Sequence, residues 1–235
     1  MVDFSQRSSE IEIMDTFNGT TDQMEFILKD INRVNRFLGG YQITLDAVFQ
    51  MISEESKKSY TILDMGCAEG TMIRKLAMEA RKREIDLKLI GIDMNAQGLE
   101  LARRYSQDFP EINFIQGDIL QTDFSKMEID LVMTTLTLHH FSNAGVLQFV
   151  DRFAQLASLG VVINDLHRSP LAYYLFKAFS FFFIRTTIAK KDGLLSIRRA
   201  FKKKELQAYA AQLPDVSHRI KWKWAFRYVW ILKKK

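Results

Sequence analysis

Cysteine is almost absent from this sequence, with Cys67 alone among 235 residues. A single cysteine excludes an intramolecular disulfide, and no group of Cys and His residues has the spacing of a zinc site. The opening residues, MVDFSQRSSEIEIMD, also lack the basic and then apolar order of a secretory signal. We therefore expect a cytoplasmic protein in a reducing compartment.

Long hydrophobic runs are missing as well. The most lipophilic stretch covers residues 171–189, where Lys177 and Arg185 leave only seven uncharged residues between them. That is too short to span a bilayer, although peripheral membrane contact stays open as an alternative. The net charge of +5 comes largely from the last 35 residues. This basic end has no nucleic-acid recognition motif, so we interpret it as solvated surface and expect no nucleic-acid partner.

Apolar strand-like runs alternate with helical segments through the middle of the chain. The runs are YTILDMG, LKLIGIDM, INFIQGD, IDLVMTTLT and GVVINDL. Continuous apolar strands separated by helices predict a parallel sheet that is covered on both faces, which is a doubly wound α/β fold. The last two runs, HRIKWKWAF and RYVWILKKK, have room only for a tight turn and predict an antiparallel hairpin.

The N-terminal part reads as helical. Residues 22–40 place apolar side chains on one helical face, with Asp22 and Glu25 at capping-box spacing and Gly39-Gly40 as the stop. A second, shorter helix follows in ITLDAVFQMI. We assign residues 1–57 to a helical lid and 58–235 to the core, with a further lid insertion at about 168–200.

The turn after the first predicted strand, DMGCAEG, is suited to binding a ligand through its backbone. Gly66 and Gly70 let N-H groups approach a ligand closely at the carboxyl end of a strand. A dinucleotide motif would need glycine where the chain has Ala68 and Thr71, and a P-loop would need a Gly-Lys-Ser/Thr that is absent. Both of those ligand classes are disfavoured.

Acidic residues stand at the ends of three consecutive predicted strands. Asp64 precedes the glycine turn, Asp93 follows Gly70 by 23 residues, and Asp118 follows the third strand. A carboxylate at the position of Asp93 can accept both hydroxyls of a ribose. Since parallel strands end at one edge of the sheet, the three acids predict one pocket.

These motifs, LDMGCAEG, GIDMN, QGDIL and IDLVMTTLTLHHF, together resemble those of class I S-adenosylmethionine-dependent methyltransferases, over roughly residues 60–165. The resemblance implies a mostly parallel seven-stranded sheet, with the terminal hairpin as its sixth and seventh strands. It implies S-adenosyl-L-methionine (SAM) as cofactor and S-adenosyl-L-homocysteine (SAH) as product. The segment DINRVNRFLGGYQITLDAV is loosely similar to the cap of ubiquinone/menaquinone-type methylases.

The resemblance also implies a contact for each part of the cofactor. Asp64 would hold the amino group, Asp93 the ribose hydroxyls and Asp118 the adenine amino group. The other residues implied to contact the cofactor are Gly66, Cys67, Ala68, Gly70, Met94, Ile119, Thr134, Thr135 and Leu136.

The sequence gives weaker signals for the acceptor, the molecule that receives the methyl group. Methyl transfer from a sulfonium needs orientation more than a nucleophilic side chain or a metal, but an oxygen acceptor benefits from a base, for which His139 and His140 are candidates. Candidate substrate contacts are His167, Phe179, Arg185, Arg198 and Arg199. We expect a small aromatic or lipophilic hydroxyl compound as acceptor. Methylation at carbon or nitrogen, and a SAM-binding protein without turnover, remain alternatives.

Overall fold

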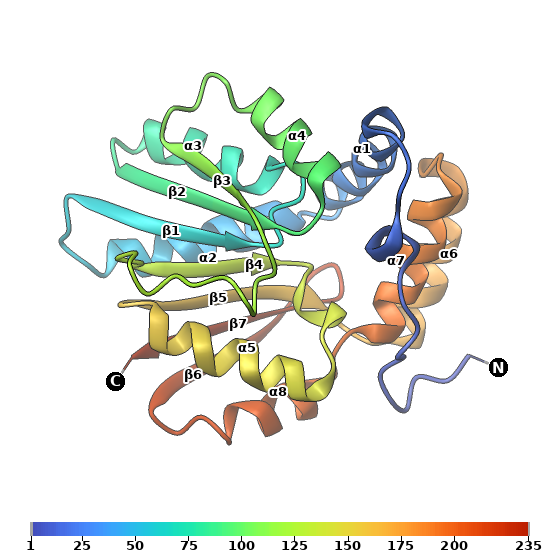
Figure 1. The fold of residues 1–235 in the computed structure, drawn as a ribbon. Coiled ribbons are helices and arrows are strands. Elements are labelled where there is room, and N and C mark those ends of the chain that lie inside the picture. The colour runs from blue at the N-terminus through green and yellow to red at the C-terminus, as the bar shows by residue number, and fades with distance from the viewer. Residues whose placement is uncertain (1, 235) are drawn as a thin grey trace.

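The centre of the molecule is a seven-stranded sheet in the order β3-β2-β1-β4-β5-β7-β6. The structure is a computed structural model that describes residues 2–234 (Figure 1). Its strands are β1 (Ser59–Met65), β2 (Asp86–Asp93), β3 (Ile112–Gln116), β4 (Leu131–Thr135), β5 (Gly160–Leu166), β6 (Val216–Lys223) and β7 (Arg227–Lys234). Strands β1 to β5 pair in parallel, and β7 is antiparallel to both β5 and β6. The predicted doubly wound fold and its terminal hairpin are confirmed.

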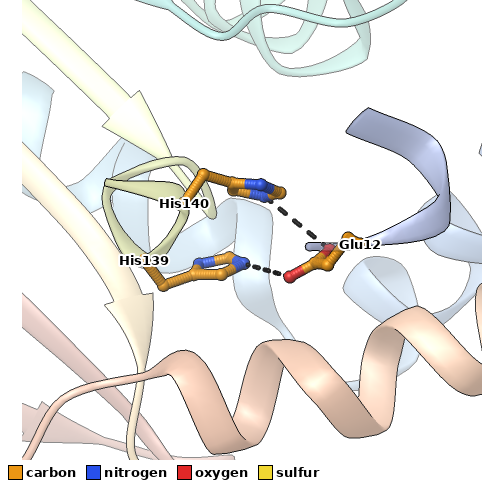
Figure 2. Close-up of side chains that lie close together, drawn as sticks. All are labelled: Glu12, His139 and His140. Carbon is orange, nitrogen blue, oxygen red and sulfur yellow. Dashed lines mark ion pairs between the residues drawn. The ribbon is translucent and has the colours of Figure 1, made fainter. Parts of the chain in front are cut away.

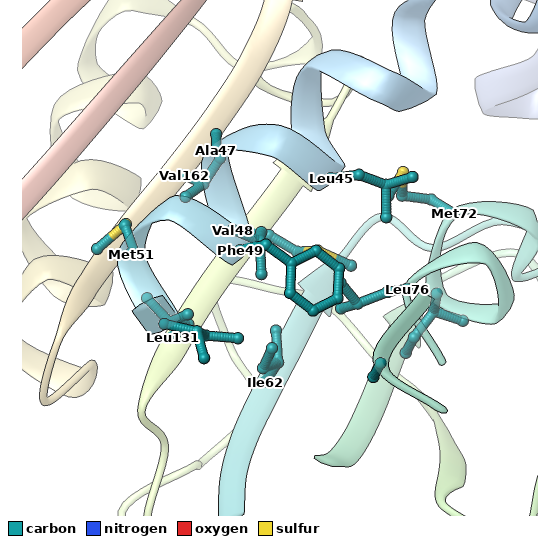
Figure 3. Close-up of a cluster of buried hydrophobic side chains, with 14 of the residues drawn as sticks. Leu45, Ala47, Val48, Phe49, Met51, Ile62, Met72, Leu76, Leu131 and Val162 are labelled. Carbon is teal, nitrogen blue, oxygen red and sulfur yellow. The ribbon is translucent and has the colours of Figure 1, made fainter. Parts of the chain in front are cut away.

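Helices cover both faces of this sheet. Consecutive residues of a strand point to opposite faces, so Ile62 of β1 joins one core and Leu63 the other. The first core contains side chains of α2 (Gly40–Ser53) and α3 (Thr71–Lys82), and Figure 3 shows Val48 and Phe49 of α2 packed near Ile62 and Leu131. The second contains side chains of α5 (Asn143–Leu156) and α8 (Lys203–Ala210).

A separate group of helices lies beyond the carboxyl ends of the strands (Figure 1). It consists of η1 (Ile13–Thr16), α1 (Thr21–Phe37), α6 (Pro170–Phe183) and α7 (Thr187–Arg199), while α4 (Ala96–Tyr105) and η2 (Leu138–His140) connect it to the sheet. The capping box of α1 is formed by Thr20 and Gln23 instead of Asp22 and Glu25, because the helix already begins at Thr21. Of residues 2–57, the N-terminal segment and α1 lie over the strand ends, whereas α2 packs on the sheet; the boundary at residue 57 stays a prediction.

The described residues include no helix with both the length and the hydrophobicity that a membrane crossing requires. In α6, Ala172 is buried and Phe179 faces inward, whereas Phe181 and Phe182 are 74% and 76% exposed. One side of α6 therefore exposes aromatic side chains to solvent.

Candidate active site

A cavity of about 1190 Å³ lies between the carboxyl ends of the strands and the group formed by η1, α1, α6 and α7. Its walls come from the first glycine turn, the ends of β2 and β4, the N-terminal segment and the three helices. Nine of the twelve residues predicted to contact the cofactor line it: Asp64, Gly66, Cys67, Ala68, Asp93, Met94, Ile119, Thr135 and Leu136. The structure therefore brings most of the predicted cofactor site together.

The glycine turn is tied to the neighbouring strand through its backbone. The amides of Gly66 and Cys67 donate to the carbonyl of Ile92 at 2.9 and 3.1 Å. Gly66 has a φ of +75°, and a Cβ there would lie 2.4 Å from Oγ1 of Thr137. A left-handed conformation beside a packed side chain requires glycine at this position.

Asp64 is a buried carboxylate without a full set of partners. Its side chain is 1% exposed, and Oδ2 has no hydrogen-bond partner within residues 2–234. Burial, together with the charges of Asp93 and Glu69, raises the pKa of Asp64 to about 8. A cationic amino group in the cavity would supply the missing partner, so this residue fits the ammonium of the expected cofactor.

Asp93 is held at the end of β2 by two backbone amides. Its Oδ2 accepts from the Ala68 amide at 2.8 Å and its Oδ1 from the Asn95 amide at 2.9 Å. Burial raises the pKa of Asp93 in spite of these bonds. Each oxygen keeps a lone pair for a further donor, which suits a ribose diol, and Met94 beside it is 67% exposed at the cavity wall.

Three predicted cofactor residues lie outside the cavity lining. Thr134 is fully buried and its hydroxyl donates to the carbonyl of Met65 at 2.9 Å. Gly70 caps α3 with a φ of +76°, and Asp118 accepts from the Leu120 amide at 2.7 Å within its own loop. Their proposed contacts with the cofactor stay predictions.

His139 and His140 both line the cavity, although adjacent side chains of an extended chain would point in opposite directions. They lie in the 3-10 helix η2 rather than in extended chain, and their ring centroids are 4.4 Å apart. A helical turn places neighbouring side chains at an angle that allows both to face the same way. Figure 2 shows both rings directed toward Glu12.

Carboxylates surround the two imidazoles. Nδ1 of His139 lies 2.8 Å from Asp165 Oδ1, and Nδ1 of His140 lies 2.9 Å from Asp15 Oδ1. The Nε2 atoms of His139 and His140 lie 3.4 and 3.8 Å from the two carboxylate oxygens of Glu12.

These carboxylates control the protonation of His139. Burial by itself would lower the pKa of His139, but Asp165 and Glu12 outweigh it and raise the pKa to about 9. With Glu12 in this position, His139 carries a proton at neutral pH and does not serve as a free base.

The N-terminal segment contributes Glu12 and Asp15 to the site, a role for which its sequence gives no periodic or motif signal. The carboxylate of Asp192 on α7 accepts from the amides of Ile13 and Met14, each at 2.9 Å. The hydroxyl of Ser196 donates to Glu12 at 2.9 Å. Side chains of α7 therefore hold this segment over the histidines.

Only one of the five predicted substrate residues lines the cavity, namely Phe179. Arg199 does not line the cavity, but it donates to the backbone carbonyls of His139 and His140 at 3.2 and 2.6 Å. Arg198 pairs with Glu10, and Arg185 is exposed. His167 also lies outside the lining, so four of these five positions are not placed to touch an acceptor in the cavity.

Arg227, at the start of β7, was not among the predicted residues. Its side chain is 1% exposed, lines the cavity and donates to Asn35 Oδ1 at 2.7 Å, while Nε and Nη1 have no hydrogen-bond partner among the described residues. Burial lowers its pKa to about 10. A buried guanidinium with unused donors is a site for an anionic group.

Comparison with solved structures defines the class of fold. The magnesium protoporphyrin IX methyltransferase ChlM from Synechocystis with bound SAM aligns with a TM-score of 0.61 at 15% identity, covering 97% of this chain and 100% of that one. The plantazolicin methyltransferase BpumL, in complex with a pentazolic desmethylPZN analog and SAH, aligns with a TM-score of 0.69 at 15% identity over 91% of both chains. The fold is thus that of the Rossmann-like methyltransferases.

Sequence comparison then identifies the domain. Residues 62–160 match the family model described as a methyltransferase domain. Malonyl-(acyl-carrier protein) O-methyltransferase 1 from Ilyobacter polytropus is 28% identical over 148 residues, which are 63% of this chain and 50% of that protein. 2-Phytyl-1,4-naphtoquinone methyltransferase from Thermosynechococcus vestitus is 32% identical over 71 residues, about 30% of each. Residues 62–160 therefore carry a methyltransferase domain, which agrees with the resemblance of the motifs, and the chain matches half or less of the length of these relatives.

Proposed function

We propose that this protein transfers the methyl group of SAM to a hydroxyl group of a small aromatic or lipophilic acceptor. The observation that carries the proposal is that one cavity joins the acidic glycine turn to a chamber walled by apolar side chains of α1 and α6. The chamber residues include Leu28, Ile31, Leu175, Phe176 and Phe179. Such walls favour an apolar acceptor and exclude water from the reaction.

The chain's own residues orient the two reactants. When bound, the cofactor supplies a sulfonium-activated methyl group. Asp64 would hold its ammonium and Asp93 its ribose, which fixes the direction in which the methyl group points. Orientation of this kind supplies much of the catalysis for an in-line displacement.

Polar groups are few in the chamber and lie on opposite elements. His139 and His140 present one polar patch after β4, and Arg227 presents a cation at β7. We infer that the histidine patch receives the acceptor's hydroxyl and that Arg227 binds an anionic or carbonyl group elsewhere on the same molecule. A relative named as an O-methyltransferase and one named as a naphtoquinone methyltransferase support an oxygen-bearing acceptor of this kind.

Calorimetric titration of the full chain with SAM tests the cofactor assignment. We expect Asp93→Asn to weaken binding at least tenfold, because it removes one of the two charged acceptors of the ribose hydroxyls, on the order of 1.5–3 kcal/mol. Asp108→Asn, at an exposed acid, is the matched control and keeps the wild-type affinity. Absence of SAM binding, or equal affinity of Asp93→Asn and wild type, contradicts the assignment.

Turnover needs a separate assay with methyl-labelled SAM and pools of phenolic and lipid-extract acceptors. Label in an ether or ester product supports transfer to oxygen, whereas label at carbon or nitrogen overturns the hydroxyl acceptor. Binding of SAM with no labelled product from any pool would identify a SAM-binding protein without catalysis.

A further inference from the structure

Three side chains with metal-ligating atoms converge at one wall of the cavity. Glu12, His139 and His140 each offer one ligand atom, and these atoms lie within 4.8 Å of one another (Figure 2). Donor atoms that share a metal ion at about 2.0–2.2 Å are about 3–3.5 Å apart. The Nε2 to Glu12 distances of 3.4 and 3.8 Å are close to that separation.

The carboxylates beside the two histidines contact Nδ1 of each ring and leave Nε2 available to bind a metal ion. Nδ1 of His139 faces Asp165 and Nδ1 of His140 faces Asp15, so that both Nε2 atoms point toward Glu12. A metal-binding histidine in proteins usually donates its other ring N-H to a carboxylate, a backbone carbonyl or a water molecule, which fixes the tautomer and the ring orientation. This pattern occurs here twice, on two adjacent residues.

His139 supplies a second, independent observation. It is 2% exposed, and although its Nε2 lies near Glu12, that atom has no hydrogen bond of acceptable geometry within residues 2–234. A buried ring nitrogen that lies 3.4 Å from a carboxylate without a hydrogen bond is costly to keep. A cation between the three groups would satisfy all of them.

The local charge also favours a cation. The carboxylates of Glu12, Asp15 and Asp165 contact the imidazoles, whereas the guanidinium of Arg199 lies 3.9 Å from Glu12 and 3.7 Å from Asp15. Arg7 and Arg227 lie near Asp165 but form no ion pair with these three carboxylates, and Arg7 donates to the backbone carbonyls of His139 and Phe141. The acidic groups therefore outnumber the side-chain cation that faces them.

We propose that Glu12, His139 and His140 bind a divalent first-row transition metal ion. Two imidazoles and one carboxylate suit Zn²⁺, Fe²⁺, Mn²⁺ or Co²⁺ better than Mg²⁺, which prefers oxygen ligands. Three protein ligands leave coordination positions open, and all three residues line the cavity. If the proposed methyl transfer holds, these positions are where the acceptor's oxygen binds.

Metal titration of the full chain, after removal of metal with a chelator and without SAM, tests the site. We expect one Zn²⁺ per chain by calorimetry and an absorption band of bound Co²⁺ in the visible range. Glu12→Gln and His140→Gln each remove a ligand and should weaken Zn²⁺ binding at least 100-fold. Asp165→Asn, which alters only the support of His139, should weaken it about 10- to 100-fold.

Controls separate this site from loss of fold and from the methyltransferase proposal. Glu10→Gln changes an exposed acid that pairs with Arg198, and it should bind Zn²⁺ like the wild type. His140 is 28% exposed, so His140→Gln should keep its circular dichroism spectrum while losing the metal. Because the metal titration is done without SAM, its outcome is independent of the methyltransferase proposal. The site is overturned if Zn²⁺, Co²⁺, Mn²⁺ and Fe²⁺ all fail to bind the wild type. It is equally overturned if both ligand variants bind metal as tightly as Glu10→Gln.

Discussion

Asp64 shows the conflict between folding and binding at a single residue. In the ligand-free fold its carboxylate is buried, and its pKa is raised to about 8. A carboxyl group whose pKa rises on folding costs stability that grows as the pH rises above its ordinary value of 3.8, and the cost is fully present above the folded-state pKa of about 8. The buried carboxyl group of Asp64 therefore destabilises the ligand-free fold. A cationic ligand that binds this carboxylate would offset that cost.

We therefore expect Asp64→Asn to stabilise the protein while it damages cofactor binding. The neutral amide has nearly the same shape, so chemical denaturation at pH 7 should show an unfolding free energy higher by on the order of 2 kcal/mol. Calorimetry should show SAM binding at least tenfold weaker, because a charge-assisted bond to the ammonium is lost. Asp46→Asn, at an exposed acid of α2, should change neither quantity. A variant that is less stable and binds SAM normally would contradict this account of Asp64.

At the scale of elements, the N-terminal segment depends on α7. Asp192 accepts the amides of Ile13 and Met14, and Asp192→Ala leaves both without these partners. We expect about 1–3 kcal/mol of lost stability and faster tryptic cleavage after Arg7, which in the native protein is held by backbone carbonyls. Mass spectrometry of a timed digest measures the cleavage, with Lys191→Ala as the neighbouring control. Equal cleavage in both variants would show that Asp192 does not hold the segment.

The elements that the sequence predicted correctly are those with a strong local pattern. The alternation of apolar runs and helical segments predicted the five parallel strands, because a strand that is buried on both faces has consecutive apolar residues. Two adjacent strand-like runs with room only for a tight turn predicted the terminal hairpin. The same pattern placed Asp64 and Asp93 at strand ends, where the cavity lies.

The missed features are contacts over long sequence distances. Glu12 reaches His139 across more than 120 residues, and Arg227 reaches the cavity from the last strand. Neither position has a local signal, since one lies in an aperiodic polar segment and the other in a basic stretch that reads as solvated surface. The pairing of His139 with Asp165 is also non-local, although Asp165 ends the fifth strand and could have been considered with the other acids at strand ends.

For the whole molecule, two of the perturbed groups of the site, His139 and Asp64, both lower the stability as the pH rises. His139 has its pKa raised to about 9, so the stability it contributes is fully present below its ordinary pKa of 6.5 and is lost as the pH passes 9. Asp64 likewise loses its favourable protonated form as the pH passes about 8. Net charge predicts the opposite trend, because a chain with a pI near 9.2 repels itself less as the pH approaches that value.

We expect the site to outweigh the net charge. In urea denaturation with a chelator present, the unfolding free energy at pH 9 should be lower than at pH 6.5 by on the order of 2 kcal/mol. The difference should shrink in His139→Gln and in Asp64→Asn, since each variant removes one titrating group, and it should persist in the control variant Asp46→Asn. A free energy that is constant or rises between these pH values in the wild type would mean that His139 and Asp64 do not titrate as their surroundings indicate. In that case the pKa values of His139 and Asp64 would lie closer to their ordinary values than burial and the neighbouring carboxylates indicate.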